Sequence, residues 1–145
     1  MARSLSLAAY MALARRGSRE APTLDSPRPE GELIWAHAPT LEKAAALMQL
    51  FTLLEAQRPG VHLLLTTPPG LPRPDHVKGN MHWQVIPEDT VPDLTRFFDH
   101  WRPERGLLSS CDLRPAALEM AARGGLVRFL PDHGAGASGR VCVPR

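Results

Sequence analysis

The sequence has few cysteines, and this limits the kinds of protein it can be. Its 145 residues include two, Cys111 and Cys142, which form no Cys-x-x-Cys pair. Small secreted domains held together by disulfides normally contain more. We therefore expect a reducing compartment, the cytoplasm.

The chain also lacks a strong excess of charge of either sign. The formal net charge is +2 with the histidines neutral, and the Lys and Arg residues are scattered rather than grouped on one expected face. Domains that bind nucleic acid usually carry a concentrated basic patch. Nucleic acid is therefore excluded as an expected partner.

Metal-binding spacings are missing as well. The six histidines and two cysteines form no i, i+4 pair and no Cys-x-x-Cys pair of the kind that zinc sites use. The Gly-rich run 134–139 is not followed by Lys-Ser/Thr, so it is not a phosphate-binding loop. The sequence predicts neither a metal site nor a cofactor.

No apolar run is long enough to cross a membrane. The longest candidate, within residues 1–16, lies between Arg3 and the pair Arg15 and Arg16, and a spanning helix needs about 20 apolar residues. We expect a short amphipathic helix with a basic end, lying on the inner-membrane surface or docked on the domain. A signal peptide is the less favoured alternative, because Ser4 and Ser6 interrupt the apolar run.

What is present indicates one globular domain. Apolar residues make up 43% and charged residues 22% of the chain, while 15 Pro and 11 Gly predict several irregular connections. Three prolines make residues 17–31 a linker, and residues 132–145 form a Gly-rich tail. The domain itself is expected at residues 32–131.

Within this domain, strand and helix patterns alternate. Thr40 supplies a helix N-cap and Pro59-Gly60 ends that helix, whereas four prolines exclude a long helix from residues 68–80. Strands are expected at 32–38, 61–67, 81–86, 106–110 and 126–130, and helices at 40–58, 90–101 and 115–123. This order predicts an α/β, Rossmann-like domain with a four- or five-stranded, mainly parallel sheet and helices on both faces.

Three stretches resemble a known family. They are the opening Arg3–Tyr10, the strand region Arg28–Ala38, and the segment from Val85 to Pro103 that contains Ile-Pro-Glu-Asp-Thr-Val-Pro and Trp-Arg-Pro. From about residue 1 to about residue 131 the chain resembles the N-terminal domain of bacterial 3-deoxy-D-manno-octulosonic acid (Kdo) transferases.

The resemblance implies a role in lipopolysaccharide biosynthesis. These transferases are GT-B glycosyltransferases with two Rossmann-like halves: the N-terminal half receives lipid A and the C-terminal half holds CMP-Kdo. The second half has no counterpart in this sequence. The resemblance further implies a cytoplasmic protein, peripheral on the cytoplasmic face of the inner membrane.

The first family motif, His-Ala-x-Ser-x-Gly-Glu after the first strand, is only partly kept. His37, Ala38 and Thr40 fit it, but Glu42 stands at the glycine and Lys43 at the glutamate. A cation thus replaces a carboxylate.

The second motif, Glu-x-Glu-Leu-Trp-Pro-Asn, appears as residues 110–116. It keeps Leu113 and Pro115 and has Asp112 in place of the second Glu. The family's general base is a Glu in the linker, and the candidate for it in this chain is Glu20, out of register. Glu20 is therefore the single catalytic candidate.

Substrate-binding candidates cluster at the expected carboxyl edge of the sheet, where ligands bind in α/β folds. His37 ends the first strand, and Thr66 and Thr67 end the second. The alternative roles are a hydrogen-bonded core histidine and capping of the strand by the threonines. The motifs add Thr40, Asp112 and Pro115 to the candidates.

Two functions follow. The chain is an acceptor domain that binds a lipid A precursor or other anionic lipid, inactive alone and dependent on a separate donor-domain protein. Alternatively it is a non-catalytic binding or regulatory module, or a remnant, as Lys43, Ser110 and Arg114 would favour. Either way we expect a self-associating or partner-seeking surface at the carboxyl edge of the sheet.

Overall fold

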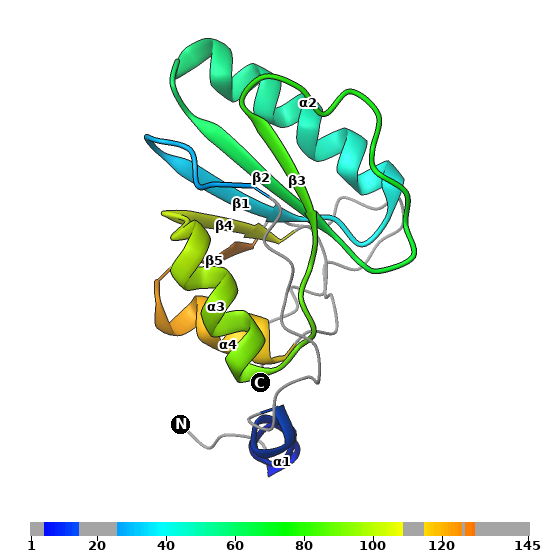
Figure 1. The fold of residues 1–145 in the computed structure, drawn as a ribbon, viewed down its shortest axis with the longest axis vertical. Coiled ribbons are helices and arrows are strands. Elements are labelled where there is room, and N and C mark those ends of the chain that lie inside the picture. Colours follow the sequence, from blue (N-terminus) through cyan, green and yellow to red (C-terminus); the bar gives the residue numbers. More distant parts are fainter. Residues whose placement is uncertain (1–4, 15–25, 109–114, 126, 130–145) are drawn as a thin grey trace, which may run out of the picture.

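The computed structural model describes residues 5–14, 26–108, 115–125 and 127–129. Five strands form one parallel sheet in the order β3-β2-β1-β4-β5 (Figure 1). They are β1 (Leu33–His37), β2 (His62–Thr67), β3 (Met81–Val85), β4 (Arg105–Leu108) and β5 (Val127–Phe129). This strand order is that of a Rossmann-like fold, which confirms the predicted fold class.

Helices cover both faces of the sheet, so the domain has three layers (Figure 1). Helix α2 (Leu41–Gln57) covers one face, and α3 (Val91–Trp101) and α4 (Pro115–Arg123) cover the other. The direction of the chain across the sheet reverses at β1, between β2 and β4. In open α/β sheets, ligands bind beside such a reversal, at the carboxyl ends of the strands.

Strand β1 is the centre of the core because it is buried on both faces. Ile34 and Ala36 pack toward α2, in a cluster that includes Phe51. Leu33 and Trp35 pack on the other face, in a cluster that includes Phe97 and Trp101. A parallel sheet covered on both faces needs such continuously apolar strands.

Local signals set the helix ends. Thr40 and Thr90 have extended backbones, and the hydroxyl oxygen of each accepts a hydrogen bond from the backbone N–H three residues on. The N-cap predicted at Thr40 is therefore confirmed, and Thr90 caps α3 in the same way. At the other end of α3, Arg102 adopts a left-handed conformation (φ 43°, ψ 55°), which stops the helix before Pro103.

The β2–β3 crossover contains no helix. Residues 68–80 run as an extended, proline-rich loop along the α2 side of the sheet, as their four prolines predicted. In a doubly wound fold a crossover of this kind normally carries a helix that packs on the sheet. The loop fills less of that space, and a groove remains between it and α2.

Helix α1 (Leu5–Ala14) packs beside α4. Met11 contacts the small cluster that joins α3 and α4, whereas Leu13 is exposed. None of its ten residues is charged, and the flanking arginines lie outside the described residues. Among the described helices, none has both the length and the apolar content needed to cross a membrane.

Candidate functional site

The predicted site residues that the structure describes lie at the carboxyl edge of the sheet or just beyond it. His37 ends β1, Thr66 and Thr67 end β2, Thr40 caps α2, and Pro115 opens α4. Glu20 and Asp112 lie outside the described residues.

His37 and Thr66 form one buried polar cluster with Trp35. The Thr66 hydroxyl accepts a hydrogen bond from Trp35 Nε1 at 2.9 Å and lies 2.9 Å from His37 Nδ1. Since a hydroxyl accepts and donates at once, Thr66 can receive the indole N–H and give its own hydrogen to the imidazole. These contacts join the ends of β1 and β2 inside the core.

Thr67 belongs to a different cluster on the opposite face. Its hydroxyl accepts a hydrogen bond from Trp83 Nε1 at 2.9 Å, and it lies on the α2 side because side chains alternate along a strand. Each tryptophan donates to a threonine two residues beyond its own register partner, Leu64 for Trp35 and Leu65 for Trp83. Thr66 and Thr67 therefore do not line one common site.

Thr40 precedes α2 as its N-cap and Lys43 lies in the first turn of α2, at the same edge of the sheet. Thr40 is exposed, and its oxygen accepts from the Lys43 backbone N–H at 3.2 Å. A cation is unfavourable at a helix N-terminus, where the backbone dipole favours negative charge. Lys43 therefore brings positive charge to a place where a carboxylate would be more favourable for the helix itself.

Sequence reasoning missed the role of Asp89. Its carboxylate accepts hydrogen bonds from the backbone N–H groups of Ala116 (3.0 Å) and Ala117 (2.8 Å) and from the Tyr10 hydroxyl (2.6 Å). Helix α4 starts with Pro115 and has no acidic residue in its first turn. The absence of an acidic residue from this turn was the sequence signal that a carboxylate from elsewhere could cap α4, because a helix N-terminus favours an anion.

Two of the stretches that carry the family resemblance meet through Arg28. Its guanidinium donates hydrogen bonds to the carbonyl oxygens of Trp101 (2.7 Å) and Arg102 (3.3 Å). A cation near the last carbonyls of a helix is stabilising. Arg28 thus attaches the segment that enters β1 to the carboxyl end of α3.

A pair of histidines lies on the α3 face, away from the carboxyl edge. His62 Nδ1 and His82 Nε2 are 3.2 Å apart, on the neighbouring strands β2 and β3. Burial, and then the nearby His62, hold the pKa of His82 below 6.5. Within the described ranges, no group of three or more His, Cys, Asp or Glu residues could hold a metal ion.

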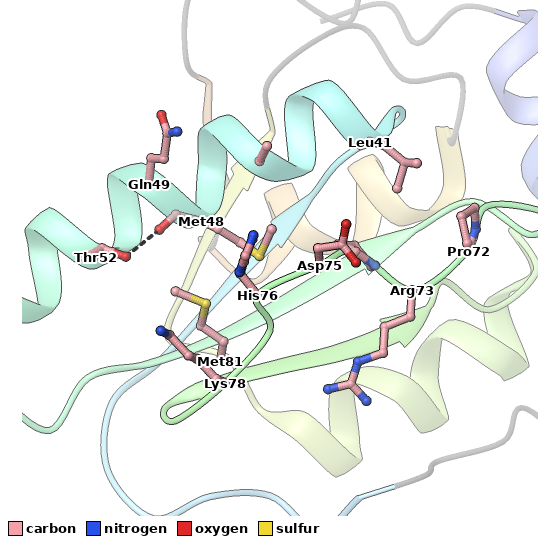
Figure 2. Close-up of a pocket in the computed structure, with 12 residues that line it drawn as sticks. Leu41, Met48, Gln49, Thr52, Pro72, Arg73, Asp75, His76, Lys78 and Met81 are labelled. Carbon is pink, nitrogen blue, oxygen red and sulfur yellow. Dashed lines mark hydrogen bonds between the residues drawn. The ribbon is translucent and has the colours of Figure 1, made fainter.

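The groove between α2 and the 68–80 loop has a volume of about 620 Å³ (Figure 2). In Figure 2, Met48 of α2, Met81 of β3 and His76 of the loop converge in its middle. His76 has a positive φ of 67°, which is uncommon outside glycine. The lining residues are Leu41, Ala45, Met48, Gln49, Thr52, Pro72, Arg73, Pro74, Asp75, His76, Lys78 and Met81.

Comparison with known protein families gives one match. Residues 11–130 match the family model described as 3-deoxy-D-manno-octulosonic-acid transferase (kdotransferase). The match extends from α1 to the end of β5. No curated protein and no solved structure matches the chain.

Proposed function

Because the chain belongs to the 3-deoxy-D-manno-octulosonic-acid transferase family, we propose that it binds the lipid acceptor in Kdo transfer, with a lipid A precursor as that acceptor. The observation that carries this proposal is the family match, which covers residues 11–130. The reaction belongs to lipopolysaccharide biosynthesis, on the cytoplasmic face of the inner membrane.

The geometry of the sheet supports an acceptor site at its carboxyl edge. His37 of β1 pairs with Leu108 of β4 at the place where the strand order reverses, and ligands of α/β folds bind beside such a reversal. Exposed Thr40 and the first turn of α2 flank the same edge. The positive charge of Lys43 there suits an acceptor that carries phosphate groups.

The same residues support acceptor binding without catalysis by this domain alone. Sugar transfer needs a carboxylate within roughly 3 Å of the acceptor hydroxyl to take its proton, and Lys43 stands where the resemblance places a glutamate. Donor and acceptor must also be held together for reaction. We propose that CMP-Kdo is held by a donor domain, so that this domain provides only the acceptor side.

Equilibrium binding of a lipid A precursor, with CMP-Kdo as a parallel ligand, tests the proposal. We expect saturable binding of the lipid A precursor and none of CMP-Kdo. Thr40→Asp keeps an N-cap oxygen but adds negative charge at the edge, and it should weaken binding at least several-fold. Thr95→Asp, at an exposed position of α3, is the control. Equal affinities for the two variants would contradict a site at this edge.

The second step of the test is transfer in the presence of a donor domain. We expect Kdo transfer only when a donor domain is present, and a higher rate for Lys43→Glu than for the control Arg96→Glu on α3. If no donor domain restores transfer to the native chain or to Lys43→Glu, the proposal of an acceptor domain in Kdo transfer fails.

Lys43 also favours a second function, a non-catalytic binding or regulatory module. In that case, neither the addition of a donor domain nor substitution of Glu20 would change the biological effect of the protein. Binding of neither the lipid A precursor nor CMP-Kdo would favour this second function over the first.

A further inference from the structure

We propose that His62 and His82 together bind one zinc ion, through Nδ1 of His62 and Nε2 of His82. The two nitrogens lie 3.2 Å apart on the neighbouring strands β2 and β3, and both side chains are partly buried. The pair is on the α3 face near the amino ends of the strands, away from the carboxyl edge. The inference therefore does not rest on the proposed function.

Pairing of the two strands brings the histidines together across 20 positions of sequence. In the register of β2 and β3, Leu64 pairs with His82, and His62 shares a face with Leu64 because side chains alternate along a strand. The sheet thus fixes both imidazoles at one place on this face. Their spacing differs from the i, i+4 and Cys-x-x-Cys spacings by which zinc ligands are recognised in a sequence.

The distance between the two nitrogens suits zinc. Zinc–nitrogen bonds are about 2.0–2.1 Å long, so a nitrogen separation of 3.2 Å corresponds to an N–Zn–N angle of roughly 100–105°, close to the tetrahedral angle. The same distance fits an N–H···N hydrogen bond, in which one ring donates to the other. Zinc binding requires the rings to rotate so that both nitrogens present lone pairs. The two arrangements exclude each other, which makes them separable by experiment.

Packing against α3 holds the His82 ring in place. Trp101 is buried, and its ring centroid lies 6.4 Å from that of His82. Its Nε1 donates a hydrogen bond of 2.9 Å to Oε1 of Gln84, two residues beyond His82 on the same strand. A ligand that packing positions before the ion arrives loses little conformational freedom on binding.

Two imidazoles supply half of a tetrahedral ligand set. Among the described residues, no group of three or more His, Cys, Asp or Glu could hold a metal ion, so water takes the remaining two positions. Imidazole suits zinc, whereas magnesium and calcium prefer oxygen ligands. We therefore expect a site that selects zinc over magnesium and binds it more weakly than a four-ligand structural site does.

Zinc bound to this pair joins an edge strand to the rest of the sheet. Strand β3 lies at one edge (Figure 1), and the crossover that precedes it contains no helix. On the opposite face, the hydrogen bond from Trp83 to Thr67 holds the carboxyl end of β3. Zinc on His62 and His82 holds its amino end, so the role of the site is to stabilise β3.

Titration calorimetry with zinc chloride, and with magnesium chloride as the comparison, tests the inference. We expect one zinc ion per pair and no measurable binding of magnesium. His62→Asn and His82→Asn should each weaken zinc binding at least tenfold. The controls are His76→Asn, at an exposed histidine outside the pair, and the double variant Cys111→Ser/Cys142→Ser, and both should bind zinc as the native protein does. Equal affinities of the native protein and His62→Asn would overturn the inference, as would loss of binding in the cysteine variant.

Nitrogen NMR of the histidine side chains identifies the ligating atoms in the native protein, so it does not depend on how the variants fold. We expect zinc to shift the resonances of His62 Nδ1 and His82 Nε2. The resonances of His100, whose ring packs on Trp101, should stay unchanged. If the resonances of the pair do not move, the rings keep their hydrogen bond and the inference is wrong.

Amide hydrogen exchange tests the role of the ion. Zinc should slow exchange in β3 at least several-fold, because it suppresses local opening of the edge strand. Strand β5, at the other edge of the sheet, is the internal control and should change much less. Equal slowing in the two strands, or none in β3, would contradict a role of zinc in holding β3.

Discussion

At the scale of single residues, His82 makes the stability of the protein depend on pH. Its pKa is held below 6.5 in the folded protein, first by burial and then by His62. The unfolded chain therefore binds this proton more readily than the folded one. The contribution of His82 to stability is fully present above pH 6.5 and is lost as the pH falls below that value.

We therefore expect the free energy of unfolding to decrease as the pH is lowered from 7.5 to 5. His82→Asn should make this decrease smaller. Chemical denaturation at several pH values measures the effect. His76→Asn is the control, because His76 is exposed and Asn also tolerates a left-handed backbone. Identical pH slopes for the native protein and His82→Asn would contradict the assignment.

Asp89 is the second residue with a predictable effect. Its carboxylate joins three segments by accepting from Tyr10 and from the first N–H groups of α4. We expect Asp89→Asn to reduce the free energy of unfolding by about 1–2 kcal/mol, because it removes the anion from the helix N-terminus. Glu88→Gln, at an exposed neighbour, should change it by less than about 0.5 kcal/mol. Equal effects in urea denaturation would show that the Asp89 contacts contribute little.

At the scale of elements, the backbone at the carboxyl end of α3 is strained because Arg102, and not a glycine, adopts a left-handed conformation there. Arg102 has φ 43° and ψ 55°, a conformation that glycine adopts without steric penalty. We expect Arg102→Gly to raise the free energy of unfolding by about 0.5–1 kcal/mol. Arg96→Gly, inside the same helix, should lower it by about 1 kcal/mol. Thermal unfolding of both variants measures the contrast, and a shift in the same direction for both would refute the explanation.

The element scale also explains the groove. A helix between β2 and β3 would cover the edge of the sheet, but the prolines in residues 68–80 remove backbone donors and prevent one. The loop that replaces it leaves Met81 and the flank of α2 partly uncovered. The proline content of this loop therefore accounts for the missing crossover helix and for the groove in its place.

At the scale of the whole molecule, the two faces of the sheet are coupled through β1. Phe51 lies in the core on the α2 side and Phe97 on the α3 side, and both cores share this strand. We expect Phe51→Ala and Phe97→Ala each to reduce the free energy of unfolding by about 3–5 kcal/mol. Each variant should still unfold in a single transition.

Tryptophan fluorescence and far-UV circular dichroism, recorded during the same denaturation, test this coupling. The two signals should coincide for the native protein and for both variants. Separate transitions would mean that the faces unfold independently, and a small effect of one variant would mean that its face contributes little to the core.

Some of the candidate site could be predicted from the sequence and some could not. His37 and Thr66 were expected at one edge of the sheet because each lies at the end of a parallel strand. In the structure, His37 Nδ1 lies 2.9 Å from the Thr66 hydroxyl oxygen. Thr67 was expected beside them but faces the other side of the sheet. Because side chains alternate along a strand, consecutive Thr66 and Thr67 have to face opposite sides of the sheet, and the sequence contained this information. The register between β1 and β2 decides which of the two threonines lies beside His37.

The sequence by itself determined the elements, their order and the parallel sheet. Apolar periodicity, N-cap residues and prolines act within a few residues of one another, so they can be read along the chain. Only the tertiary structure decided the rest: the contact of Asp89 with α4, the hydrogen bond from Trp35 to Thr66, and the groove beside α2. These features join residues far apart in sequence, and their partners depend on how complete layers pack together.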